Sequence, residues 1–343
     1  MSSARFAGNR CVTVDRAASN RCRFVPEDSG GHYESYFLRA NHPHRPLGFW
    51  IRYTVFSPKE RPRDAVGELW AIYFDGERAR IAVAKEIFPI RACEFSRSGL
   101  EVRIGEAVLR EDRLAGRTQS REQALQWDLR YAGSQPPLLL LPAAFYERGF
   151  PKAKALVGTP NAVFEGVLTV NGETIAVKRW VGSQNHNWGR RHTDSYAWGQ
   201  VCGFDGAPDT FLECATARLR LGPYRSPALT MLVLRTEEGE FRLNGLAQAL
   251  RARGEFDFRS WRIESATSKL RVSAFVEAPK AAFVGLLYDN PPGGRKICLN
   301  TKLATCELVL EQAGRSKRRL TTKYRAAFEI LTEREDHGVA IAA

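Results

Sequence analysis

The stretch that decides the fold of this chain is residues 180–204, WVGSQNHNWGRRHTDSYAWGQVCGF. From residue 196 onward, bulky and small side chains alternate strictly. The bulky set is Tyr196, Trp198, Gln200, Cys202 and Phe204, and the small set is Ala197, Gly199, Val201 and Gly203. A period of two is typical of a β-strand. This part therefore predicts a strand whose bulky face fills a core or lines a cavity.

The earlier part of the stretch holds the box His186-Asn187-Trp188-Gly189, with a further glycine at Gly182. Glycine adopts backbone conformations that other residues avoid. We therefore expect a sharp turn here that aims His186 and Trp188 at a specific target.

The HNWG box at residues 186–189 is followed by H-x3-Y-A-W at residues 192–198. Together they resemble the superfamily of carotenoid 1,2-hydratases (hydroxyneurosporene synthases), tocopherol cyclases and fungal Diels–Alderases. A second stretch, YDNPPGGRKICLNTK at residues 288–302, is similar to bacterial members. The resemblance implies two lipocalin-like β-domains, an isoprenoid or polyketide-like ligand, and functional roles for His186 and Trp188. It implies a ligand class better than a reaction, because the members carry out different chemistry.

The rest of the chain also favours β-structure. About fifteen short apolar runs are separated by turn residues, which is typical of sandwiches and barrels, and Asn171-Gly172 is the strongest hairpin signal. We predict an all-β protein of two lipocalin-like (calycin-type) antiparallel barrels or sandwiches packed together. Prolines punctuate residues 136–160, which we interpret as the connection between an N-terminal domain (residues 1–135) and a C-terminal domain (residues 161–343) that carries the HNWG segment.

The net charge of +13 favours polyanions or anionic membrane surfaces. No helix-turn-helix, RRM or zinc-finger pattern predicts nucleic-acid binding. The one dense basic cluster, residues 315–319, indicates a solvated hairpin, with contact to acidic lipid as the alternative. Seven cysteines without CxxC spacing indicate reduced thiols, and the leader MSSARFAGNR lacks the apolar core of a signal peptide. We expect a cytoplasmic protein, with peripheral membrane contact left open.

Aromatic residues of the stretch can form a wall that stabilises a carbocation, because aromatic faces attract cations. The alternative is an ordinary barrel core, for which aromatic residues are equally suited. The predicted ligand-binding residues are Tyr196, Trp198, Trp180, Gln200, Trp50 and Trp70.

Three residues are candidate proton donors. The pKa of a free histidine lies close to neutrality, so His186 is one, unless its ring simply bonds the backbone of its own turn. Related sequences often carry an acidic residue before the second histidine, where this chain has Arg191. Glu213 is the candidate replacement, as the one charge on the apolar face Phe211, Glu213, Ala215, Ala217, Leu219, Leu221. Burial would raise its pKa, unless the carboxyl is paired with an arginine or exposed. Asp194 is either an acid or the cap of a turn.

No metal or nucleotide cofactor is expected. His186, His192 and Asp194 match no metal-ligand spacing, and the GxGxxG, P-loop, GxSxG and HExxH motifs are absent. The sequence therefore predicts cofactor-free acid chemistry on a long apolar molecule, namely hydration or cyclisation of a double bond. Two alternatives remain: a non-catalytic carrier of a hydrophobic ligand, which needs no ionisable group beside the aromatic residues, and a module that binds anionic surfaces.

Overall fold

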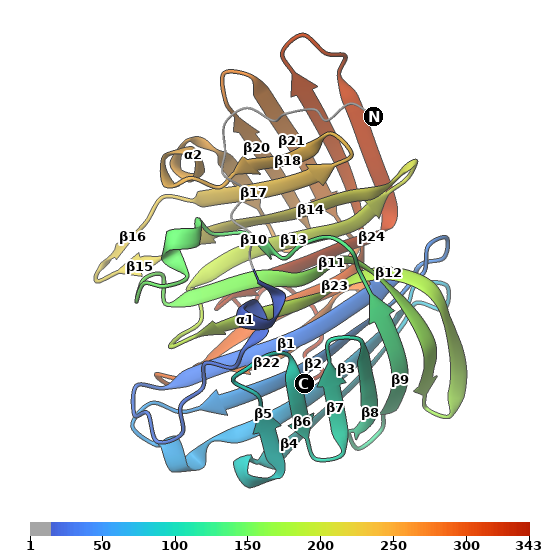
Figure 1. Cartoon of the computed structure of the whole chain (residues 1–343), viewed down its shortest axis with the longest axis vertical. Coiled ribbons are helices and arrows are strands. Elements are labelled where there is room, and N and C mark those ends of the chain that lie inside the picture. The colour runs from blue at the N-terminus through green and yellow to red at the C-terminus, as the bar shows by residue number, and fades with distance from the viewer. Residues whose placement is uncertain (1–14) are drawn as a thin grey trace.

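The computed structural model describes residues 15–343. The leader MSSARFAGNR, predicted to hold no signal peptide, and Cys11 lie outside the described residues. The described chain is almost entirely antiparallel β-structure, as predicted, and its strands form two large sheets that pack together (Figure 1).

The first sheet has the strand order β4-β3-β2-β1-β12-β11-β9-β8-β7-β6-β5, with β10 paired to β11. It coils on itself, so that β4 packs near β8 and β9, and it encloses a core that includes Phe49, Tyr53, Trp127 and Phe164. Its strands are β1 (His32–Asn41), β2 (Leu47–Ser57), β3 (Val66–Asp75), β4 (Arg80–Pro89), β5 (Cys93–Phe95), β6 (Glu101–Ile104), β7 (Ala107–Arg110), β8 (Arg113–Gln119), β9 (Ala124–Ala132), β10 (Leu138–Leu139), β11 (Ala153–Val170) and β12 (Glu173–Gly189).

The second sheet has the order β18-β17-β14-β13-β24-β23-β21-β20-β19, with β22 paired to β23. Its own core includes Leu212, Trp261 and Phe328. Its strands are β13 (Ser195–Phe204), β14 (Ala207–Arg218), β17 (Leu229–Thr236), β18 (Gly239–Leu243), β19 (Arg253–Phe256), β20 (Ser260–Ala266), β21 (Leu270–Glu277), β22 (Val284–Asp289), β23 (Arg295–Gln312) and β24 (Arg318–Thr332).

Short elements complete the described chain. The small ribbon β15 (Arg220–Leu221) and β16 (Tyr224–Arg225) stands apart from both sheets. The helices are α1 (Arg16–Asn20) and α2 (Leu246–Arg251), and the 3-10 turns are η1 (Pro62–Asp64), η2 (Ile90–Ala92), η3 (Ala143–Phe145) and η4 (Lys280–Ala282).

The boundary between the two sheets differs from the one expected at residue 160. Strands β11 and β12 hydrogen-bond into the first sheet, where His186 of β12 lies opposite Tyr36 of β1, and the second sheet begins with β13. The predicted hairpin at Asn171-Gly172 is present, with φ of +51° and +85°. A local turn signal fixes a hairpin, but the sheet that a hairpin joins depends on pairing with residues about 150 positions away.

The HNWG box forms no sharp turn, which corrects the expectation from its glycines. Gly182 and Gly189 are strand residues of β12. A Cβ atom at Gly182 would lie 1.8 Å from the carbonyl oxygen of Arg39, and one at Gly189 would lie 2.3 Å from that of Lys152. The glycines therefore permit close approach of the neighbouring strands, and the chain turns only afterwards, at residues 190–194.

Between the two sheets lies a third layer of side chains, which we call the seam. Phe37, Trp50 and Trp70 of the first sheet meet Trp198 and Leu286 of the second within it. Strand β13 shows the predicted alternation, because its small residues Ala197 and Val201 face the core of the second sheet. A bulge at Gly203, with φ of +76°, interrupts the alternation and moves Phe204 to that core instead of the bulky face.

Outside the seam, the basic cluster forms a hairpin between β23 and β24, as predicted. Its side chains are paired: Arg315 and Arg318 with Glu238, Lys317 with Glu311, and Arg319 with Glu307. Among the described residues, none of the six cysteines forms a disulfide. No helix in residues 15–343 is long and apolar enough to cross a membrane.

Candidate functional site

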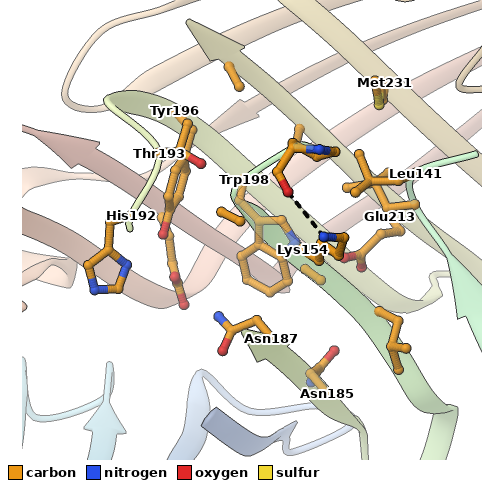
Figure 2. Close-up of a pocket in the computed structure, with 18 of the residues that line it drawn as sticks. Leu141, Lys154, Asn185, Asn187, His192, Thr193, Tyr196, Trp198, Glu213 and Met231 are labelled. Atoms are coloured by element: carbon orange, nitrogen blue, oxygen red, sulfur yellow. Dashed lines mark hydrogen bonds between the residues drawn. The ribbon is translucent and has the colours of Figure 1, made fainter. Parts of the chain in front are cut away.

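A cavity of about 410 Å³ opens in the seam. Its size falls in the range of small-molecule sites, about 300–1,000 Å³. The first sheet contributes Phe37, Trp50, Arg52, Asn185 and Asn187, and the second contributes Tyr196, Trp198, Glu213, Met231 and Tyr288. Figure 2 shows how side chains from β12, β13 and β14 converge on the space around Trp198.

The connection between the expected domains forms a third wall of this cavity. Leu141, Phe145, Phe150, Pro151 and Lys154 line it, and the Lys154 ammonium donates to the carbonyl of Pro151 at 3.1 Å (dashed in Figure 2). Phe150 and Leu246 also line the cavity although each is 52% exposed. These two side chains therefore mark its apolar mouth.

Glu213 lies in the cavity wall with only 2% of its surface exposed. One carboxyl oxygen accepts from the Trp198 indole N–H at 2.8 Å, and the other accepts from the Gln200 amide at 2.8 Å. Burial raises the pKa of Glu213 to about 7, although the bonds from Trp198 and Gln200 and the charge of Arg39 act to lower it. Because burial disfavours the charged form, a large part of this carboxyl is protonated at neutral pH.

A fully buried polar network holds Glu213 in place. The Gln200 side-chain oxygen accepts from Arg39 Nε at 3.1 Å and from the Ser183 hydroxyl at 2.6 Å, while its nitrogen donates to Asn185 at 2.8 Å as well as to Glu213. These four contacts fix which way the amide faces. Gln200 does not line the cavity itself, so the predicted ligand-binding residue instead positions the acid.

The aromatic wall beside Glu213 consists of Trp198, Tyr196 and Trp50, all predicted from the sequence. Trp198 meets Phe37 edge to face at 5.9 Å. The Lys302 ammonium lies 5.6 Å from the Trp198 ring and 5.8 Å from the Trp50 ring. Both indole faces thus already accommodate positive charge, as expected for aromatic rings near a cation.

His186 and Trp188 do not line the cavity, and this corrects the sequence hypothesis. Side chains alternate along β12, and Asn185 and Asn187 face the cavity, so the residues between and beyond them face away. The Trp188 ring instead packs 4.8 Å from His186, 5.9 Å from Tyr146 and beneath the Arg23 guanidinium at 3.7 Å.

His186 belongs to a buried cluster around Glu34. Its Nε2 atom lies 2.8 Å from Glu34, its Nδ1 atom lies 2.9 Å from the carbonyl of Ser19, and its ring stacks on Tyr36. Acceptors at both nitrogens favour a protonated ring, whereas burial lowers the pKa of His186. In the neutral ring only one nitrogen can donate, and Nε2 is then the donor that serves Glu34. His186 therefore ties α1 and the segment after it to the first sheet.

The remaining predicted residues lie elsewhere. Trp180 packs in the core of the first sheet. Trp70 lies in the seam, where its N–H donates to Glu68 at 3.2 Å, but it does not reach the cavity. Asp194 pairs with Arg191 and accepts from the backbone N–H of Arg220, so it joins the turn after β12 to β15.

Several cavity residues were not identified from the sequence, and Arg52 is the clearest of them. It is 4% exposed and lines the cavity beside Tyr288, whose ring lies 4.4 Å from the guanidinium carbon. A signal was present, because Arg52 is the one charge in the apolar run GFWIRYTVF, just as Glu213 is the one charge on its apolar face. His192 also lines the cavity, stacked on Tyr33 at 4.0 Å. Burial lowers the pKa of His192 to about 3, so the ring is neutral.

Comparison with known protein sequences finds relatives that are themselves uncharacterised. No family model matches the chain. Two uncharacterised proteins of Mycobacterium tuberculosis, MT0513 of strain CDC 1551 / Oshkosh and Rv0493c of strain H37Rv, are each 25% identical over 287 residues, covering 84% of this chain and 83% of theirs.

Two solved structures share the two-sheet architecture along most of both chains. Kievitone hydratase from Nectria haematococca superimposes with a TM-score of 0.57 at 11% identity, covering 94% of this chain and 97% of the hydratase. CghA, solved with Sch210972, gives a TM-score of 0.56 at 9% identity, covering 93% and 96%. At such low identity the likeness establishes the fold alone.

Proposed function

We propose that this protein binds a long apolar molecule of the isoprenoid or polyketide kind in the seam cavity and carries out cofactor-free acid chemistry on it. The reaction is hydration or cyclisation of a double bond. The observation that carries this proposal is Glu213, a buried carboxyl with a pKa raised to about 7 that borders an aromatic cavity.

Glu213 is suited to deliver a proton, whereas His186 is not. Each Glu213 oxygen accepts one hydrogen bond, from Trp198 or Gln200, so a lone pair on each remains for a proton. Among the described residues, no lysine, arginine or histidine pairs with this carboxyl within 4.0 Å, and a neutral acid near pH 7 is what a general acid requires. His186, by contrast, faces the opposite side of β12.

The chemistry proceeds in two steps that balance. Glu213 transfers its proton to one carbon of a double bond, and the positive charge that forms on the other carbon lies among the faces of Trp198, Tyr196 and Trp50. In hydration, water then adds to the cation and returns a proton to the Glu213 carboxylate. In cyclisation, a hydroxyl of the same molecule adds to the cation and returns its proton to the Glu213 carboxylate. Where a second double bond adds instead, a C–C bond forms, the charge moves to a new carbon, and a neighbouring carbon loses a proton to the Glu213 carboxylate. Kievitone hydratase, which has the same fold, bears the name of a hydratase.

The test begins with identification of the ligand. Purified protein is exposed to an extract of cellular lipids, and the retained molecule is identified by mass spectrometry. That molecule is then incubated with the protein and monitored for the gain of one water or for conversion to an isomer of unchanged mass.

Glu213→Gln keeps the shape of the side chain but removes the acid. We expect turnover to fall by about 10²–10⁴-fold, the usual contribution of a general acid, while ligand affinity changes less than about threefold. Glu307→Gln, on an exposed ion pair with Arg319, is the matched control and leaves both unchanged. Binding without turnover by the unaltered protein contradicts the catalytic proposal and supports the non-catalytic carrier. Full turnover by Glu213→Gln excludes Glu213 as the acid.

A further inference from the structure

The seam cavity contains a second buried charge that the chemistry proposed above does not use. The Arg52 guanidinium is 4% exposed, and within residues 15–343 its one hydrogen bond goes from Nη2 to the Ser35 hydroxyl at 2.7 Å. Its Nε–H group has no partner among the described residues. A guanidinium carries five N–H donors, so most of its bonding capacity is unused by the protein.

Within residues 15–343, no carboxylate forms a direct ion pair with Arg52, and the two nearby carboxyls pair with other cations. Glu68 pairs with Lys85 at 3.1 Å, and Glu329 pairs with Lys302 at 2.7 Å. Burial acts to lower the pKa of Arg52, but Tyr288, Glu68 and Glu329 nearby hold it above its ordinary value, so the group stays charged. A buried, unpaired charge is costly for a protein to keep.

Aromatic rings surround the guanidinium in the cavity wall. Tyr288 lies 4.4 Å from its central carbon, and Trp50 and Trp70 lie 5.8 and 6.0 Å away. Aromatic rings hold a guanidinium by its face and leave its N–H edge available. Two further cavity-lining residues also have buried polar atoms without partners among the described residues, namely Trp50 Nε1 and Asn187 Oδ1.

We infer that Arg52 anchors an acidic oxygen group, such as a carboxylate, at one end of the apolar ligand. A planar guanidinium matches a carboxylate with two parallel hydrogen bonds, and the Trp50 N–H is a further donor in the same wall. His192, which is tilted against Tyr288 at 5.7 Å, and Glu213 lie on opposite sides of Trp198 in Figure 2. The anchored end therefore lies away from the acid, and the reacting double bond reaches Glu213.

This inference rests on the proposed binding of an apolar ligand, but an experiment can disprove the Arg52 anchor while the apolar site still stands. The test uses a matched pair of probes, farnesoic acid and farnesol, which share one isoprenoid chain and differ in a carboxylate or a hydroxyl. Their affinities for the purified full-length protein are measured by titration calorimetry at pH 7.5. We expect the acid to bind at least about tenfold more tightly than the alcohol, because a hydrogen-bonded charge contributes more than a neutral group.

Arg52→Met should remove this preference by weakening the acid about tenfold or more and leaving the alcohol within about threefold. Arg52→Lys keeps the charge but not the planar fork, so it should retain part of the preference. Arg23→Met is the matched control, because Arg23 also stacks on a tryptophan but lies outside the cavity, and it should keep the full preference. Thermal melting establishes that each variant is folded before titration.

Equal binding of acid and alcohol by the unaltered protein, or a preference that survives in Arg52→Met, overturns the anchor and leaves the apolar site standing. Failure to bind either probe counts against both the anchor and the apolar ligand class. Should Arg52→Met not fold, a preference that is reduced in Arg52→Lys supports the anchor, and a preference equal to that of the unaltered protein overturns the paired hydrogen bonds proposed for the guanidinium.

Discussion

Two buried glutamates lie on either side of the stretch that decides this fold, and they behave in opposite ways. Glu34 is fully buried beside His186, and Glu213 is 2% exposed beside Trp198. The pKa of Glu34 lies well below its ordinary value. Burial acts to raise this pKa, but the hydrogen bonds from His186 and His32 together lower it by more. The pKa of Glu213 is raised to about 7.

The number of donors explains the difference. Glu213 accepts from Trp198 and Gln200 only. The groups that donate to Glu34 are the Cys22 thiol, the backbone N–H groups of Arg23 and Phe24, the rings of His32 and His186, and the Tyr36 hydroxyl. Hydrogen bonds to a carboxylate favour its ionised form, whereas burial without enough of them favours the acid. The many donors around Glu34 therefore stabilise its ionised form and join several segments through it. Glu213, with two donors, stays partly protonated and can act as an acid.

The largest expected effect is a difference in stability between variants of the two glutamates. Glu34→Gln should lower the free energy of unfolding at pH 7 by about 3 kcal/mol, because it leaves several buried donors facing a neutral amide. Glu213→Gln should change it by less than about 1 kcal/mol, because the carboxyl it replaces is already about half neutral at pH 7 and accepts only two hydrogen bonds. Urea unfolding followed by tryptophan fluorescence measures both. Equal losses in the two variants would contradict the distinction between them.

The second prediction compares the tryptophans beside these glutamates. Trp198→Phe should weaken binding of the apolar ligand about three- to tenfold, because it reduces an aromatic face in the cavity wall. Trp188→Phe should leave affinity unchanged, since Trp188 packs on Arg23 and Tyr146 away from the cavity. Titration calorimetry on both folded variants checks this. A larger loss of affinity in Trp188→Phe than in Trp198→Phe would mean that the ligand binds on the other face of β12.

The third prediction is a pH dependence. The folded-state pKa of Glu213, about 7, lies above the ordinary value of 4.5. The folded state therefore binds more protons between these values, and the stabilisation from protonated Glu213 is complete below about pH 4.5 and is lost as pH rises through about 7.

The measurement is the free energy of unfolding between pH 5 and pH 8 for the unaltered protein and Glu213→Gln. Stability should fall more steeply with pH in the unaltered protein, and proton-dependent turnover should also decline as pH rises through about 7. Parallel stability curves for the two proteins would show that Glu213 does not titrate in this range.

Local sequence patterns predict on which face of a strand a side chain lies. Alternation along residues 196–202 correctly puts Trp198 and Ala197 on opposite faces of the strand, because a strand period of two depends on backbone geometry alone. Which face meets which core is decided by the packing of the sheets. The same reasoning identifies Glu213 as the one charge on an apolar face, while its burial is decided by the packing of the two sheets. It applies equally to Arg52, the one charge in the apolar run of residues 48–56.

By itself, the sequence determined the strands, the all-β class and the single charges placed among apolar residues, since these follow from local periodicity and turn chemistry. Only the tertiary structure decided that β12 joins the first sheet through β1, because strand pairing over such a distance leaves no local pattern. That pairing directs His186 and Trp188 away from the cavity and Asn185 and Asn187 toward it. The number of donors around each glutamate, and hence which one retains its proton, depends on groups that meet only when the two sheets pack together.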